Sequence, residues 1–185
     1  MKGHYFNSAR QDPQELAELV AFLKKKQIRS YLEIGSMYGG ALWAVVQGAM
    51  TAPSRVVSVD RPKKKWDSER SLRECIDNLK SLGHDARLFL GDSMHVNIVK
   101  AVRKLAPFDA IMIDADHKEP SVRADFANYG KLSKIICFHD IDNPVRLNMD
   151  VGTVWKDLKR THKDKASFTE ISNNADYGIG ILQWV

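Results

Sequence analysis

The chain has 185 residues, of which 44% are hydrophobic and 28% are charged, with a formal net charge of +5. This length and composition fit one domain with a substantial core and argue against a disordered chain. No segment reaches the ~18 consecutive apolar residues of a membrane span, and the first residues lack the apolar core of a signal peptide. The two cysteines do not suggest a disulfide framework. We therefore expect one cytoplasmic domain over residues 1–185, with residues 1–27 as an N-terminal arm and helix.

The first predicted helix begins after Asp12, which can cap it. Pro13 suits the first turn, and Glu15 completes a capping-box pattern. Apolar residues then recur at helical spacing until three lysines at 24–26, where the end of a helix favours cations.

Strand and helix patterns alternate through the rest of the chain. The predicted strands cover residues 28–34, 55–60, 86–90, 108–114 and 134–139, and the predicted helices cover 40–50, 67–82, 93–105, 120–129 and 151–162. Such alternation predicts an α/β fold with a parallel sheet covered on both faces. Two further strands, 167–171 and 178–184, predict an antiparallel hairpin at one edge of the sheet.

A glycine-rich turn follows the first predicted strand in residues 33–40 (EIGSMYGG). Gly35 and Gly40 match the outer glycines of a dinucleotide fingerprint, but Met37 stands where the glycine that admits a pyrophosphate is needed. This argues against NAD and FAD, and no Gly-Lys-Ser/Thr follows to make a phosphate-binding loop. A plain tight turn would explain one glycine, but it does not explain three glycines and a carboxylate.

Carboxylates also follow the next two strands, at Asp60 and Asp92. Asp60 ends its strand and can accept hydrogen bonds from both hydroxyls of a ribose, or it can cap the next segment. Asp92, before Ser93, is either a helix cap or an acceptor for an adenine amino group. Asp60 and the glycine turn together indicate a nucleoside ligand.

The motifs EIGSxxGG at 33–40, Asp60, GD at 91–92, IDADH at 113–117 and FHDI at 138–141 occur in this order. The ordered set resembles the class I S-adenosylmethionine-dependent methyltransferases over residues 11–185. It is most similar to the small-molecule O-methyltransferase branch, near the macrolide-sugar and cephalosporin-hydroxylase-like members. The resemblance implies a Rossmann-like three-layer sandwich, with a seven-stranded sheet whose last strand is antiparallel.

The resemblance also implies where S-adenosylmethionine binds. Glu33, Gly35 and Ser36 would border its methionine part, Asp60 its ribose, and Asp92 with Ser93 its adenine. The full set of cofactor-binding residues that we expect is Glu33, Gly35, Ser36, Gly39, Asp60, Asp92, Ser93 and Asp114.

Ionisable residues gather at the ends of the fourth and fifth predicted strands. They are Asp114, Asp116, His117, His139 and Asp140. Related O-methyltransferases place metal-binding carboxylates there, so Asp114, Asp116 and Asp140 are the candidate ligands for Mg²⁺ or another divalent cation.

Two differences from the relatives affect this metal site. Ile141 stands where catechol-type relatives have an asparagine, which removes one oxygen ligand. His139 stands where some relatives have another carboxylate, and a histidine ligand would shift the metal preference of the site toward softer ions.

Two histidines are the predicted catalytic residues. His117 follows Asp114 at the spacing where catechol-type relatives carry a lysine base, and an imidazole can take a proton near neutral pH. His139 is expected to act as a ligand or a second base. Each could alternatively be an ordinary polar residue.

The sequence leaves alternatives to a small-molecule methyltransferase. The basic charge and residues 63–66 (KKKW) suit either a solvated loop or a nucleic acid methyltransferase. Residues 142–145 (DNPV) lack the second proline and the aromatic residue of the amino-methylating motif. A non-catalytic nucleoside-binding module is the remaining alternative. With no long cap domain, the pocket for a small-molecule acceptor is either open or completed by a second subunit in a homodimer.

Overall fold

The structure is a computed structural model that describes residues 9–62, 67–142, 149–173 and 177–185. Its helices are α1 (Pro13–Lys25), α2 (Gly40–Ala49), α3 (Ser68–Ser81), α4 (Val96–Arg103), α5 (Glu119–Tyr129) and α6 (Val151–His162). Its strands are β1 (Ser30–Ile34), β2 (Arg55–Asp60), β3 (Asp85–Leu90), β4 (Phe108–Ile113), β5 (Ser133–His139), β6 (Ala166–Ile171) and β7 (Ile179–Trp184). The predicted elements are all present, although α4 begins later than residue 93.

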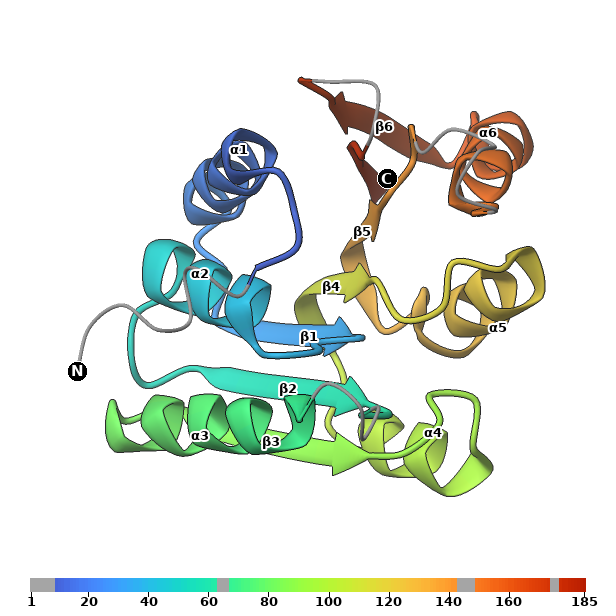
Figure 1. The fold of residues 1–185 in the computed structure, drawn as a ribbon. Coiled ribbons are helices and arrows are strands. Elements are labelled where there is room, and N and C mark those ends of the chain that lie inside the picture. The colour runs from blue at the N-terminus through green and yellow to red at the C-terminus, as the bar shows by residue number, and fades with distance from the viewer. Residues whose placement is uncertain (1–8, 63–66, 143–148, 174–176) are drawn as a thin grey trace.

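The described strands form one seven-stranded sheet in the order β3-β2-β1-β4-β5-β7-β6 (Figure 1). The first five strands in this order are parallel, while β7 runs antiparallel to both β5 and β6. The predicted Rossmann-like architecture with a C-terminal antiparallel hairpin is therefore confirmed. Because β7 lies between β5 and β6, β6 is the edge strand on that side.

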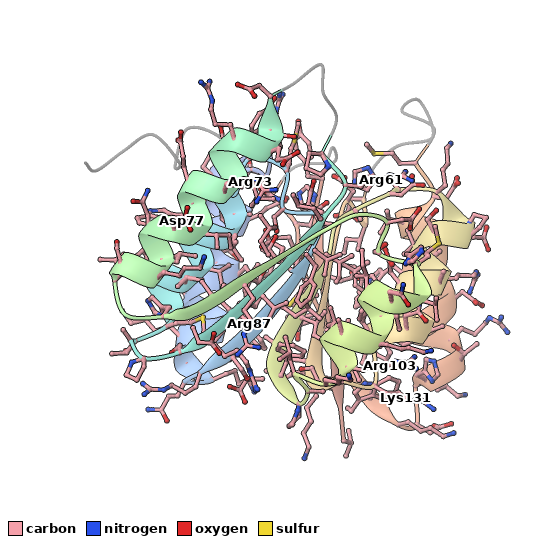
Figure 2. All side chains as sticks on the ribbon, turned by 90° about the horizontal axis from the view of Figure 1, so that it is seen from below. Arg61, Arg73, Asp77, Arg87, Arg103 and Lys131 are labelled. Carbon is pink, nitrogen blue, oxygen red and sulfur yellow. The ribbon has the colours of Figure 1, made fainter. Side chains whose placement is uncertain are left out.

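Two apolar cores hold the layers together, one on each face of the sheet. The first core joins α1, α2 and α3 to one face, and the second joins α4, α5 and α6 to the other (Figure 1). The neighbouring strands β4 and β5 contribute side chains to both cores, which explains their nearly continuous apolar sequences. Charged side chains such as Arg73, Asp77 and Arg103 lie on the outer surface (Figure 2).

The parallel strands end together at one edge of the sheet. Ile34 at the end of β1 is in register with Val59 of β2 and Ile113 of β4, and Ile113 is in register with Phe138 of β5. The polar residues that follow these strands are therefore brought to a common place, where open α/β sheets bind their ligands.

The start of α1 follows the predicted cap at Asp12, but the predicted capping box is wrong: the Glu15 carboxylate accepts from the N–H groups of Asn173 and Gly178 instead. The Asp12 carboxylate accepts hydrogen bonds from the backbone N–H groups of Gln14 and Glu15, and Pro13 occupies the first turn. Within the residues that the structure describes, no helix combines the length and the apolar character needed to cross a membrane.

Candidate active site

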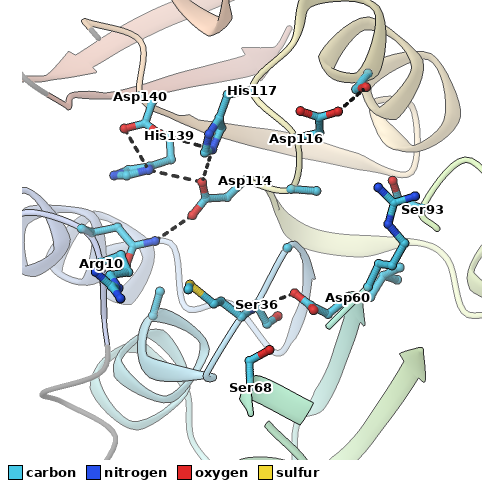
Figure 3. A pocket seen from close by; sticks show the side chains of 18 of the residues that line it. Arg10, Ser36, Asp60, Ser68, Ser93, Asp114, Asp116, His117, His139 and Asp140 are labelled. Carbon is cyan, nitrogen blue, oxygen red and sulfur yellow. Dashed lines mark hydrogen bonds and ion pairs between the residues drawn. The ribbon is translucent and has the colours of Figure 1, made fainter. Parts of the chain in front are cut away.

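A cavity of about 760 Å³ lies at the carboxyl ends of the parallel strands. Ten of the predicted site residues line it: Gly35, Ser36, Asp60, Asp92, Ser93, Asp114, Asp116, His117, His139 and Asp140 (Figure 3). Two predicted site residues, Glu33 and Gly39, are not among the lining residues.

Backbone packing explains two of the glycines. Gly35 has φ +93°, and a Cβ atom there would lie 2.3 Å from the carbonyl oxygen of Asp114. Gly39 has φ +85°, and a Cβ atom there would lie 2.8 Å from the Cβ of Cys75 on α3. A side chain at position 35 would push β1 away from the end of β4, and one at position 39 would push α2 away from α3. The glycine pattern is thus required by the fold whether or not a ligand is bound.

Glu33 lies below the cavity, inside the protein. Its side chain is buried and accepts a 2.9 Å hydrogen bond from the Tyr31 hydroxyl. Burial raises the pKa of Glu33 to about 8, although the hydroxyls of Tyr31 and Ser36 act in the opposite direction. The predicted contact of Glu33 with the methionine part of a cofactor stays a prediction.

One end of the cavity is built by the ends of β2 and β3. The Asp60 carboxylate accepts a 2.7 Å hydrogen bond from the backbone N–H of Met37, so it fixes the glycine turn. Asp92 accepts from the N–H of Met94 and forms a 2.9 Å ion pair with Arg61. Both carboxylates therefore have a structural role, and both also face the cavity.

The other end of the cavity contains four alternating acids and imidazoles. His117 Nε2 lies 3.2 Å from Asp114 Oδ1 and 3.2 Å from Asp140 Oδ2. His139 Nδ1 lies 3.2 Å from Asp114 Oδ1 and 3.4 Å from Asp140 Oδ1 (Figure 3). Each of these ring nitrogens faces two carboxylates and therefore acts as a donor. We define these four residues as the Asp–His cluster.

The cluster strongly changes the acidity of its members. Burial lowers the pKa of His139, but Asp114 and Asp140 outweigh it and raise that pKa to about 10. Burial lowers the pKa of His117 as well, and Asp114 and Asp140 again produce a net increase. Burial raises the pKa of Asp114, yet the two imidazoles hold it well below its usual value. His139 is thus expected to stay protonated at neutral pH.

Of the three predicted metal ligands, Asp114 and Asp140 lie together in the Asp–His cluster, whereas Asp116 is held by other contacts. The Asp116 carboxylate accepts hydrogen bonds from the Ser121 hydroxyl at 2.8 Å and the Lys118 N–H at 3.3 Å. The ligand atoms of Asp114, His117 and Asp140, in contrast, all lie within 4.8 Å of one another. A cation site at this position would therefore use His117 as the third ligand.

Two further groups of residues line the cavity and were not predicted from the sequence. Gln11, before α1, donates a 2.7 Å hydrogen bond to Asp114 Oδ2, and the neighbouring Arg10 also lines the cavity. Tyr177, before β7, stacks on His139 with ring centroids 6.0 Å apart. These segments are far from the motifs in sequence and have no local pattern that would predict their position.

A family model described as a methyltransferase domain matches residues 32–141. The chain belongs to this family. The match includes the glycine turn, Asp60, Asp92 and the entire Asp–His cluster, and it confirms the resemblance to methyltransferases found in the sequence.

Solved methyltransferase structures share the fold. An O-methyltransferase from Bacillus cereus in complex with SAH is 20% identical, with a TM-score of 0.70 over 94% of this chain and 82% of that chain. TomG, an O-methyltransferase from Streptomyces achromogenes involved in tomaymycin synthesis and solved with SAM, is 16% identical, with a TM-score of 0.68 over 100% of this chain and 91% of that chain.

A third similar structure is SAH-bound PaMTH1, a methyltransferase from Podospora anserina. It is 16% identical to this chain, with a TM-score of 0.67 over 95% of this chain and 80% of that chain. These likenesses establish the methyltransferase fold. The predicted lysine-rich segment 63–66 and most of the 142–145 motif lie outside the described residues, so the role of that basic segment stays a prediction.

Proposed function

We propose that this methyltransferase transfers the methyl group of S-adenosylmethionine to a hydroxyl oxygen of a small molecule. One observation supports this proposal most directly: a single cavity joins the carboxylates at the ends of β2 and β3 to the Asp–His cluster at the ends of β4 and β5. The first end suits a nucleoside, and the second suits proton removal from an acceptor.

The nucleoside would bind beside Asp60. Its carboxylate faces the cavity while its contact with the Met37 N–H keeps it in place. Met37 occupies the position in the turn where dinucleotide-binding proteins have their middle glycine. This end therefore favours a single nucleoside over a dinucleotide.

Arg10 is suited to bind the carboxylate of the methionine part. Among the described residues, three arginine or lysine side chains line the cavity; of these, Arg61 pairs with Asp92 and Lys118 has interactions of its own. The Arg10 guanidinium has no ion pair with any residue that the structure describes. Arg10 and Ser93 lie on opposite sides of the cavity (Figure 3). A nucleoside held beside Asp60 and Asp92 would therefore extend its amino-acid chain toward Arg10.

S-adenosylmethionine supplies a methyl group made electrophilic by a sulfonium. His117 is the base that we favour, because its Nε2 donates to the carboxylates and its Nδ1 remains available to take a proton. The acceptor oxygen forms a bond to the methyl carbon while the carbon–sulfur bond breaks, and the hydroxyl proton passes to His117. His139 is protonated at neutral pH, which makes it a charge partner for Asp114 and disfavours it as the base.

The Asp–His cluster also fits a divalent cation. Asp114, His117 and Asp140 offer two carboxylates and an imidazole, and the contact of Asp140 Oδ1 with His139 Nδ1 is long, at 3.4 Å. This mixed donor set suits borderline metals better than Mg²⁺. A bound cation would make the acceptor hydroxyl more acidic.

The first test concerns the nucleoside. We expect the protein to bind S-adenosylhomocysteine in calorimetry and to bind NAD much more weakly. Asp60→Ala should weaken S-adenosylhomocysteine binding by about 1–3 kcal/mol, because ribose hydroxyls would lose their acceptor. Asp77→Ala on the exposed face of α3 is the control. Equal affinity for NAD, or unchanged affinity in Asp60→Ala, would argue against the proposal.

The second test concerns Arg10. Arg10→Gln should reduce affinity for S-adenosylhomocysteine by about tenfold, the effect of losing one charged hydrogen bond. Affinity for 5′-methylthioadenosine, which lacks the amino-acid carboxylate, should not change. Arg73→Gln, which removes an exposed cation from α3, is the matched control. An equal loss for both nucleosides would contradict a specific role for Arg10 with the carboxylate.

A further inference from the structure

A fully buried carboxylate connects α1 to the segment between β6 and β7. The Glu15 side chain is 0% exposed, and its two oxygens accept hydrogen bonds from different backbone groups. Oε1 accepts from the Asn173 N–H at 3.0 Å, and Oε2 accepts from the Gly178 N–H at 2.9 Å. One side chain thus holds both ends of the connection, 158 and 163 residues away in the sequence.

The backbone at Tyr177 and Gly178 is also held from the opposite side. The Ile141 N–H donates to the Gly178 carbonyl at 3.2 Å, and the Asp142 N–H donates to the Tyr177 carbonyl at 2.8 Å. Gly178 has φ +79°, and a Cβ there would lie 2.3 Å from Asp142 Oδ2. This backbone therefore fits tightly between Glu15 and the residues that follow β5.

The ring of Tyr177 transmits this restraint to the active site. It stacks on the buried His139 ring with an interplanar angle of 18°, and it lines the cavity beside the Asp–His cluster. Gln11, just before α1 begins, also contacts this cluster, through a hydrogen bond to Asp114. The start of α1 therefore contacts the cluster through Gln11, and through Glu15 it binds the backbone next to Tyr177.

We propose that Glu15 is a positioning residue for the acceptor side of the active site. Through Gly178 it holds Tyr177 against His139, so that the aromatic ring forms a fixed wall where the acceptor approaches the Asp–His cluster. This role depends on the proposed methyl transfer for its purpose, but the geometry can be tested without an acceptor.

The test compares Glu15→Gln with Glu18→Gln in protein saturated with S-adenosylhomocysteine. Glu15→Gln keeps the shape of the side chain but replaces one acceptor oxygen with an NH₂ group that cannot accept from a backbone N–H. Glu18 is the matched control, because it is exposed on the same helix and contacts Asn173 only through the Asn173 side chain. We expect Glu15→Gln to lose the NOE between the Tyr177 and His139 rings and Glu18→Gln to keep it.

Binding of S-adenosylhomocysteine should be unchanged in both variants, because Asp60 and Arg10 are untouched. A folded Glu15→Gln protein that keeps the ring–ring NOE would overturn the inference. Should this variant fail to fold, hydrogen exchange of the wild type decides: the Gly178 amide should be protected, and rapid exchange there would overturn the inference. If the wild type fails to bind S-adenosylhomocysteine, the proposed function fails, while the NOE and exchange measurements without ligand still test Glu15.

Discussion

Replacing His117 with alanine is expected to reduce turnover by roughly 10²–10⁴, the usual contribution of a general base, while cofactor affinity is retained. The position of the side chain explains both expectations. His117 lies in the Asp–His cluster, with Nε2 held by Asp114 and Asp140, and away from Asp60 at the nucleoside end. Turnover would be measured on an acceptor found by screening hydroxyl compounds, and affinity by calorimetry with S-adenosylhomocysteine.

The pH dependence gives an independent readout of the same residue. A base must be unprotonated, so the rate should rise with pH through the pKa of His117. The neighbouring carboxylates raise this pKa, which places the rising limb above the ordinary value of 6.5. In His117→Ala the limb should disappear, and added imidazole should partly restore turnover. Unchanged turnover in both His117→Ala and Asp140→Ala would mean that the cluster is structural.

Chelation separates the metal-free base from a metal site built on the same residues. Full activity in EDTA would support His117 as a metal-free base. Loss of activity that Mn²⁺ or another divalent ion restores would instead assign Asp114, His117 and Asp140 as ligands, and His117 could then not be the free base.

The sequence predicts the parts of this site that follow the strands. Asp60, Asp114 and Asp140 each come at or directly after a strand, and parallel strands end at the same edge. The alternation of elements likewise predicts the sheet and its final hairpin. These features depend on local patterns and on general rules of α/β topology.

Contacts between distant segments were not predictable from the sequence. Gln11 reaches Asp114 across 103 residues, and Tyr177 reaches His139 from the final hairpin. The role of the glycines was not predictable either. Gly35 and Gly39 match a ligand-binding pattern, but the atoms next to them belong to the residues after β4 and to α3. Packing and ligand binding select the same residue there, and a sequence alone does not separate the two causes.

Glu33→Gln is expected to make the protein more stable at alkaline pH and to reduce the pH dependence of its stability. Burial raises the pKa of Glu33 from 4.5 to about 8, so the folded state keeps this carboxyl protonated in a range where the unfolded chain has released the proton. Unfolding then releases a proton, and the free energy of unfolding falls as pH rises from the unfolded pKa to about 8. Between pH 5 and pH 8 this single group should cost the wild type on the order of 3 kcal/mol. Glutamine is uncharged throughout and keeps an oxygen that can accept from the Tyr31 hydroxyl.

Urea unfolding of both proteins at several pH values measures this effect. Burial also raises the pKa of Asp125, to about 6, so the wild-type curve alone does not isolate Glu33. The informative quantity is the difference between the Glu33→Gln and wild-type curves, which should be small at pH 5 and grow toward pH 8. Glu74→Gln neutralises an exposed carboxylate on α3, and its free energy of unfolding should change with pH as that of the wild type does. If the stability of Glu33→Gln instead changes with pH as the wild type does, the pKa of Glu33 in the folded protein is close to its value in the unfolded chain, and burial does not raise it.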